Sequence, residues 1–291
     1  MYCLLNSLFT FQVAYFNIFT VHKLFFLLVL FTISCTAFCQ SKIDYGNNKV
    51  AGKYYNIRGI NLYTEQYGNG QPVLLIHGNG GSIKSMASAI PYFSNNYKVI
   101  AIDSRSHGKS TDNADSLSFE MMADDCAELL NQMHIDSAYV IGWSDGGIVA
   151  LILAMRHPNK VIKLASTGAN LWPDSTALIP SLWKNEKTTY DSLKFKKKVS
   201  SKEKNDWKVF MLDWEQPNIS LTTLQNILCP SLIICADRDV INLEHTVKIY
   251  QNIRNANLWI LPNSGHATLI EHADEFNKKV DSFFKNSFKK R

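Results

Sequence analysis

The stretch "VIGWSDGGIVAL", Val140 to Leu151, places a single serine among glycines where one apolar pattern gives way to another. The apolar run before Gly142 is typical of a buried strand, and the run after Gly147 is typical of a helix. A strand that turns directly into a helix forces the turn residue into a strained backbone conformation, and nearby glycines make room for it. Ser144 is therefore expected at the C-terminal edge of a sheet, beside the free N–H groups of a helix start.

Short apolar runs like the one that ends at Ser144 occur along the whole chain, and helical patterns lie between them. They cover residues 72–78, 98–104, 137–144, 160–167, 230–237 and 256–263. Upstream, "YYNIRGINLYTEQYG" (54–68) indicates two short strands that turn at Arg58-Gly59. Continuous apolar strands that alternate with helices are typical of a parallel sheet covered on both faces. The sequence therefore predicts an α/β protein with a mostly parallel, eight-stranded sheet flanked by helices.

The alternation breaks once, between Leu171 and about Gln225, where four tryptophans lie among charged residues and no buried strand is evident. A long surface loop is the alternative, but roughly 50 structureless residues would be unusual in a compact fold. We therefore expect a helical cap inserted at about 172–225 in a single domain spanning 50–289.

The N-terminal residues 1–39 differ from the rest, since Lys23 is their only charged residue. An apolar core (24–33) and smaller residues follow it, a pattern typical of a secretory signal peptide. Cleavage near Ala37 or Cys39 is expected, and the mature protein would be exported to the periplasm or secreted. Membrane association would arise only through an uncleaved N-terminus or lipidation at Cys35.

Charge and cysteine usage exclude several other classes. The formal net charge is +5 and the sequence pI is about 8.7, so the composition gives no support for nucleic-acid binding. Cys126, Cys229 and Cys235 are the cysteines outside the leader, and they show no metal-ligand spacing. Buried free thiols are expected. Neither a metal nor an organic cofactor is predicted.

The chain offers Ser144 a base and an acid. A serine hydroxyl is a weak nucleophile that needs a base to take its proton and an acid to orient that base. His266 follows the last predicted strand, where a loop can bring it over Ser144. Asp237 and Asp239 both follow the preceding strand. Asp239 lies further past the strand end and is preferred as the acid, with Asp237 as the alternative.

The segment "HGNGG", His77 to Gly81, follows the strand at 72–78. Its glycines would let a backbone N–H face the pocket, so an oxyanion hole is predicted from the N–H groups of Asn79 and Asp145. The alternative is an ordinary flexible turn. His77 is expected to brace this loop, and Arg105 and His107 to pack a second glycine-rich turn nearby.

Five motifs in order, "LLIHGNGG", "IDSRSHGKS", "GWSDGG", "ICADRDVI" and "NSGHA", resemble the α/β-hydrolase superfamily over about residues 54–284. Within it, "GWSDGG" with "PNKVIKLASTGANLW" looks like the biphenyl hydrolase-like group, which includes valacyclovir hydrolase. In that group the aspartate after the nucleophile is understood to receive the α-ammonium group of amino-acid esters. The resemblance implies this role for Asp145. The alternative is that Asp145 caps the following helix or bonds to a residue of the inserted cap.

The expected activity is that of a serine hydrolase that cleaves a small ester, with an α-amino-acid ester as one candidate, through an acyl-enzyme. Asp145, Trp143 and Trp172 are the candidate substrate-binding residues, the tryptophans lining an apolar pocket. The alternatives are a C–C bond hydrolase, an enol-lactonase or an aminopeptidase on the same fold. From a different class, the chain could be a non-catalytic binding protein on a hydrolase scaffold.

Overall fold

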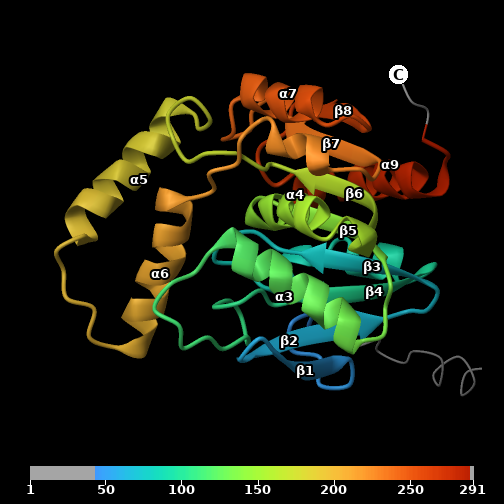
Figure 1. The fold of residues 1–291 in the computed structure, drawn as a ribbon, viewed down its shortest axis with the longest axis horizontal. Coiled ribbons are helices and arrows are strands. Elements are labelled where there is room, and N and C mark those ends of the chain that lie inside the picture. The colour runs from blue at the N-terminus through green and yellow to red at the C-terminus, as the bar shows by residue number, and fades with distance from the viewer. Residues whose placement is uncertain (1–42, 289–291) are drawn as a thin grey trace, which may run out of the picture. The chain divides into compact units, whose positions relative to one another are not determined.

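A computed structural model describes residues 43–288, so the predicted signal peptide lies outside the described residues. Within this part of the chain, no helix combines the length and apolar character needed to cross a bilayer. Eight strands form one sheet, drawn in Figure 1. Their bounds are β1 Gly52–Ile57, β2 Ile60–Tyr67, β3 Gln71–Ile76, β4 Tyr97–Ile102, β5 Ala138–Trp143, β6 Val161–Thr167, β7 Ser231–Ala236 and β8 Ala256–Leu261.

The strands lie in the order β1-β2-β4-β3-β5-β6-β7-β8. β1 and β2 form an antiparallel hairpin, and β2 also pairs antiparallel with β4. The hairpin turns at Arg58 and Gly59, both with positive φ (47° and 82°), as the sequence predicts. All other neighbouring pairs are parallel, so the predicted mostly parallel sheet is confirmed.

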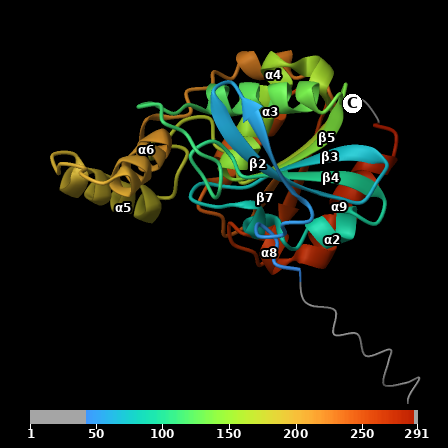
Figure 2. The ribbon, with the colours of Figure 1, turned by 90° about the horizontal axis from the view of Figure 1, so that it is seen from below.

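Helices cover both faces of the sheet, as Figure 2 shows. On one face pack α3 (Phe119–Gln132), α4 (Asp145–Arg156) and α7 (Leu243–Asn252). On the other pack α2 (Ile90–Phe93), α8 (Thr268–Glu271) and α9 (Ala273–Lys285). Short 3₁₀ helices complete these layers: η1 Ile83–Met86, η2 Pro158–Lys160 and η3 Thr223–Asn226.

Each central strand is buried on both faces because its successive side chains point to opposite layers. In β3, Leu74 and Ile76 belong to the core beneath α3 and α4. Val73 and Leu75 belong to the core beneath α2 and α9. This arrangement explains why the strands appear in the sequence as continuous apolar runs. The C-terminal edge of the sheet is left for the loops that carry the polar motifs.

The segment between β6 and β7 contains two long helices, α5 (Pro180–Leu193) and α6 (Ser201–Glu215). In Figure 1 they lie side by side, outside the layers that cover the sheet. Aromatic rings join them, since Tyr190 of α5 stacks on Trp214 of α6 with ring centroids 4.6 Å apart. Asn205 of α6 also donates to the backbone oxygen of Ser106 (2.9 Å), which ties α6 to the turn after β4.

The cysteines within the described residues are free thiols. Cys126 and Cys235 are buried in the core, and Cys229 is partly exposed. Burial raises the pKa of the Cys235 thiol to about 12 and that of Cys229 to about 11, which keeps both in the unreactive protonated form.

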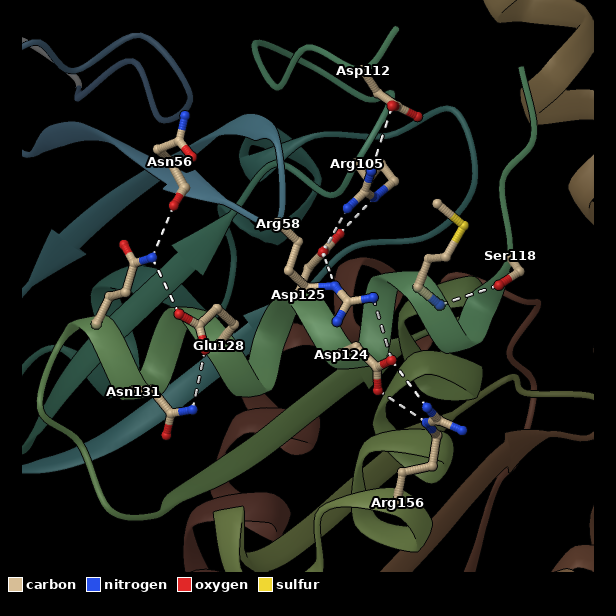
Figure 3. A network of polar contacts seen from close by, with 12 residues as sticks. Asn56, Arg58, Arg105, Asp112, Ser118, Asp124, Asp125, Glu128, Asn131 and Arg156 are labelled. Carbon is tan, nitrogen blue, oxygen red and sulfur yellow. Dashed lines mark hydrogen bonds and ion pairs between the residues drawn. The ribbon is translucent and has the colours of Figure 1, made fainter. Parts of the chain in front are cut away.

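A buried ion pair anchors the turn after β4 to α3 (Figure 3). Arg105 donates from Nε and Nη2 to the two carboxylate oxygens of Asp125, each at 2.7 Å. The two side chains are only 4% and 1% exposed. Arg105 therefore packs this turn, as expected. The neighbouring pair of Arg156 with Asp124 has similar geometry but an arginine that is 47% exposed.

These two pairs in one network give a matched test of burial. Replacing Arg105 by methionine leaves the buried Asp125 carboxylate with only the longer contact to the half-exposed Arg58 (3.4 Å), so Arg105→Met is expected to lower the free energy of unfolding by about 3–5 kcal/mol. Arg156→Met should cost about 1 kcal/mol or less, because its pair is exposed to water. Urea denaturation measures both values. Equal losses for the two variants would contradict this account of the turn.

Candidate active site

Ser144 lies at the single-residue turn between β5 and α4. Its backbone has φ 56° and ψ −119°, a conformation that is strained for any residue with a Cβ. Three backbone hydrogen bonds hold it there: Ser144 N–H donates to Thr167 O (2.8 Å), and the N–H groups of Gly147 (2.8 Å) and Ile148 (3.1 Å) donate to Ser144 O. The strain predicted from the strand-to-helix change is therefore present at this serine.

Glycines on both sides make the turn sterically feasible. A Cβ on Gly142 would lie 2.0 Å from the Gly146 oxygen, and a Cβ on Gly146 would lie 2.1 Å from the Ile76 oxygen. Both contacts are with backbone, which cannot easily move away. The glycine pattern around Ser144 is therefore a requirement of close packing between α4 and strands β3 and β5.

The structure brings His266 and Asp239 to Ser144. His266 follows β8 and its Nε2 lies 2.9 Å from Ser144 Oγ, while its Nδ1 lies 2.6 Å from Asp239 Oδ1. Because a carboxylate only accepts, Nδ1 carries a proton and donates it to Asp239. Nε2 is then free to accept from the Ser144 hydroxyl. Gly168, with φ +66°, lets the ring approach, since a Cβ there would lie 2.7 Å from His266 Cε1.

Asp239 is only 6% exposed and also accepts from the Ile241 N–H (3.1 Å), which fixes its carboxylate. The alternative acid, Asp237, has a different environment. Its two oxygens accept from the backbone N–H groups of Asn263 (2.8 Å) and Ser264 (3.1 Å). Asp237 therefore holds the loop that follows β8, and Asp239 is the aspartate that contacts His266.

The loop 77–81 crosses Ser144. A Cβ on Gly78 would lie 2.9 Å from the Ser144 Cβ, so the loop passes directly over the serine. His77 Nε2 accepts from the Ser104 N–H (3.0 Å), and its Nδ1 donates to Gly78 O (2.7 Å). Burial, together with the neighbouring His107, lowers the pKa of His77 to about 3, so this histidine is neutral. It braces the loop, as expected.

The backbone N–H groups of Asn79 and Asp145 were the predicted oxyanion donors. Among the described residues neither amide has a hydrogen-bond acceptor. Asp145 is the first residue of α4, where N–H groups have no partner within the helix. Both amides are thus free to donate, that of Asn79 from the 77–81 loop and that of Asp145 from the start of α4.

The Asp145 side chain is buried (3% exposed) and bonded to both the 77–81 loop and the inserted helix α6. Asn79 Nδ2 donates to Asp145 Oδ2 (3.0 Å) and to the Val209 oxygen in α6 (3.3 Å). Asp213 of α6 also hydrogen bonds to Asp145. Burial and the charge of Asp145 raise the pKa of Asp213 well above its usual range, and burial also raises the pKa of Asp145, so one proton is shared between the two carboxyl groups.

A third carboxyl group, Glu186 of α5, completes an acidic cluster with Asp145 and Asp213. Burial, and then the Asp145 charge, raise the pKa of Glu186 to about 7. Among the described residues no group of three side chains has the arrangement of a metal site. The bond to Asp213 corresponds to the alternative in which Asp145 contacts a residue of the inserted cap.

The sequence did not predict that Glu186 or Asp213 would be part of the site. For Asp213 a weak signal exists, because it lies four residues after the buried Val209 and therefore on the same face of α6. Glu186 has no comparable signal, since α5 buries none of its residues fully.

The predicted pocket tryptophans have polar contacts of their own. Trp143 donates from Nε1 to the His266 backbone oxygen (3.0 Å), which places it behind the histidine loop. Trp172 donates from Nε1 to Thr176 Oγ1 (2.7 Å) and packs edge-on against His245. In this structure, Trp143 positions the histidine loop and Trp172 anchors the start of the inserted segment against α7.

The raised pKa of Glu186 predicts a pH-dependent effect on stability. The folded protein holds this proton up to about pH 7, whereas an unfolded chain releases it near the ordinary value of 4.5. Folding is therefore opposed increasingly as the pH rises through this window. Glu186→Gln, which removes the ionisation beside Asp145 and Asp213, should raise the Tm relative to wild type by more at pH 8 than at pH 5.

Asp191→Asn on the same helix is the control for this experiment. Lys187 and Lys194 lower the pKa of Asp191, so its carboxylate is ionised at both pH values. Its substitution should change the Tm equally at pH 5 and pH 8. If Glu186→Gln also changed the Tm by the same amount at pH 5 and pH 8, the conclusion that Glu186 has a raised pKa in the folded protein would be contradicted.

Comparisons with known proteins agree with this architecture. A family model described as "alpha/beta hydrolase fold" matches residues 71–187. The human protein named serine hydrolase BPHL is 27% identical over 250 residues, which cover 78% of this chain and 84% of the human protein. A 2-hydroxymuconate semialdehyde hydrolase from a Pseudomonas strain is 31% identical over 127 residues, covering 42% of this chain and 45% of that protein.

Solved structures of similar fold include a meta-cleavage product hydrolase from Pseudomonas fluorescens and an enol-lactonase from Burkholderia xenovorans. The first has a TM-score of 0.65 at 24% identity, covering 80% of this chain and 97% of that one. The second has a TM-score of 0.66 at 19% identity, covering 80% of this chain and all of that one (100%). The sheet order, the serine turn and these comparisons show that the chain has the α/β-hydrolase fold, and a serine hydrolase named BPHL is among the proteins to which it is similar.

Proposed function

We propose that the protein is a serine hydrolase that cleaves small esters through an acyl-enzyme. The observation that carries this proposal is the continuous hydrogen-bonded relay from Ser144 Oγ to His266 and on to Asp239. Such a relay activates a hydroxyl that is otherwise unreactive near neutral pH. Its chain order of serine, aspartate and histidine is the order found in α/β hydrolases.

In the proposed mechanism Ser144 Oγ attacks the ester carbonyl carbon as His266 Nε2 takes the hydroxyl proton. Asp239 holds the imidazole in the productive tautomer and balances the imidazolium charge. When the tetrahedral intermediate collapses, Nε2 gives that proton to the departing alcohol. A water molecule then transfers a proton to Nε2 as it attacks the acyl-enzyme, and Nε2 returns that proton to Ser144 Oγ as the acid is released.

The amides of Asn79 and Asp145 would stabilise the developing oxyanion. The support is that both are free of internal acceptors and that the 77–81 loop passes directly over the serine. The donors are fixed in advance, Asp145 by its place at the start of α4 and Asn79 by its side-chain bonds to Asp145 and α6. Preorganised donors of this kind usually contribute a large part of the rate enhancement.

Among hydrolase substrates, the side chain of Asp145 favours an acyl group that carries a cation, such as an α-amino-acid ester. A buried carboxylate beside the reacting carbonyl is stabilised by an ammonium group and destabilised by another anion. A muconate, the compound class in the name of the Pseudomonas relative, carries a carboxylate that Asp145 would repel. Ester hydrolysis is therefore preferred to C–C bond cleavage.

The relay predicts a sharp difference between two aspartates of one loop. Asp239→Asn removes the carboxylate that sets the His266 tautomer, so kcat on a p-nitrophenyl ester should fall by about 10⁴-fold. Ser144→Ala should fall at least as far. The matched control is Asp237→Asn. Because the Asp237 carboxylate accepts only from the backbone N–H groups of Asn263 and Ser264, the kcat of this variant should stay within about tenfold of wild type.

Steady-state kinetics of the four proteins, with circular dichroism to show that each is folded, measures these effects. A folded wild-type protein without activity on any ester would favour the alternative of a binding protein on a hydrolase scaffold. Equal losses for Asp237→Asn and Asp239→Asn would show that Asp239 is not the orienting acid.

A further inference from the structure

A cavity of about 550 Å³ opens next to the proposed oxyanion loop, and the proposed mechanism makes no use of it. Its walls come from four parts of the chain: the 79–81 loop, the 106–108 turn, α5 and α6. Asp145 lies next to it, through its bonds to Asn79 and Asp213, which both line the cavity. A substrate held at Ser144 could therefore extend past Asp145 into this space.

The charged groups on the cavity wall have one sign. Glu186 from α5 and Asp206 and Asp213 from α6 line it, and among its lining residues there is no lysine or arginine. This contrasts with the formal net charge of +5 for the whole chain. Asp206 is exposed and already paired with Lys202. Glu186 and Asp213 are therefore the carboxyl groups of the wall that a cationic ligand would contact.

A second, independent feature of the wall is an unpartnered buried acceptor. His107 lines the cavity and is only 5% exposed. Its Nδ1 donates to the Arg105 oxygen (2.8 Å), and its Nε2, which carries the lone pair in the neutral ring, has no hydrogen-bond partner among the described residues. The side-chain amides on the wall are already used: Asn79 Nδ2 donates to Asp145 and to the Val209 oxygen, and Asn205 Nδ2 donates to the Ser106 oxygen.

The wall thus presents two carboxyl groups and an imidazole lone pair with no free cation to meet them. Burying carboxylates without a counter-charge is unfavourable, and burial accordingly raises the pKa values of Glu186 and Asp213. A ligand rich in N–H donors and positive charge would satisfy all three groups at once. Ammonium and guanidinium groups are the organic groups that donate without accepting.

We propose that this cavity binds the second positive charge of a dicationic acyl substrate, such as an ester of lysine, ornithine or arginine. Asp145 faces the ammonium next to the scissile carbonyl, and Glu186, Asp213 and His107 Nε2 receive the side-chain ammonium or guanidinium group. The inference rests on the proposed function for the hydrolytic step and adds a specificity-determining subsite to it.

The test compares pairs of ligands that differ only in the second charge. The wild-type kcat/KM is measured for the ethyl esters of lysine and norleucine, and of arginine and citrulline. Calorimetry measures the binding of lysinamide and norleucinamide. The cationic member of each pair is expected to be preferred by about tenfold or more, the scale of a close, partly buried charge pair. Glu186→Gln and Asp213→Asn should each reduce that preference several-fold, while Asp191→Asn, an exposed carboxylate of α5, should leave it at the wild-type value.

The outcomes separate this inference from the proposed function. Cleavage of lysine and norleucine esters at equal kcat/KM, with equal amide binding, would overturn the subsite and leave the serine hydrolase intact. Preferential lysinamide binding without hydrolysis of any ester would support the subsite and overturn the proposed reaction. Because the comparison of ligands uses the wild-type protein, the subsite is tested even if a variant fails to fold.

Discussion

The positive φ of Ser144 is the constraint on which the rest of the site depends. One residue separates the end of β5 from the start of α4, and its backbone is held at φ 56° by hydrogen bonds to Thr167 and Gly147. This geometry presents the hydroxyl and the first amide of α4 to the same space. The loop over Ser144 and the imidazole beside it then approach so closely that Gly78 and Gly168 have no room for a side chain.

The strands and the relay residues could be predicted because their signals are local. Each central strand is buried on both faces, so an apolar run marks it, and the predicted runs extend only one to two residues beyond the observed strands, as at β3 and β4. Ser144, Asp239 and His266 follow strand ends, and parallel strands deliver such positions to one edge. The choice between Asp237 and Asp239 needed the structure, since it depends on which carboxylate is used by the amides of Asn263 and Ser264.

The lining of the substrate space could not be predicted in the same way. Glu186 and Asp213 reach Asp145 through the packing of α5 and α6, which depends on rings such as Tyr190 and Trp214 and has no sequence motif. Tryptophans pose a related difficulty, because an indole is both an apolar surface and an N–H donor. Trp143, expected in the pocket, uses its N–H to hold the His266 loop.

The acidic cluster connects the fold to its chemistry. Asp145 contributes its backbone to the proposed oxyanion hole and its side chain to a bond with α6, so the reacting centre and the inserted helices share one residue. A change in the position of α6 would therefore alter the charge next to the nucleophile. This coupling gives the inserted segment a direct physical route to substrate selection.

Covalent trapping tests the central claim most directly. The folded wild-type protein is treated with a fluorophosphonate, digested and mapped by mass spectrometry. The account predicts one adduct per chain, on the hydroxyl of Ser144, and its loss when His266 is replaced by alanine. An adduct on a different residue, or none on a folded protein, would contradict it.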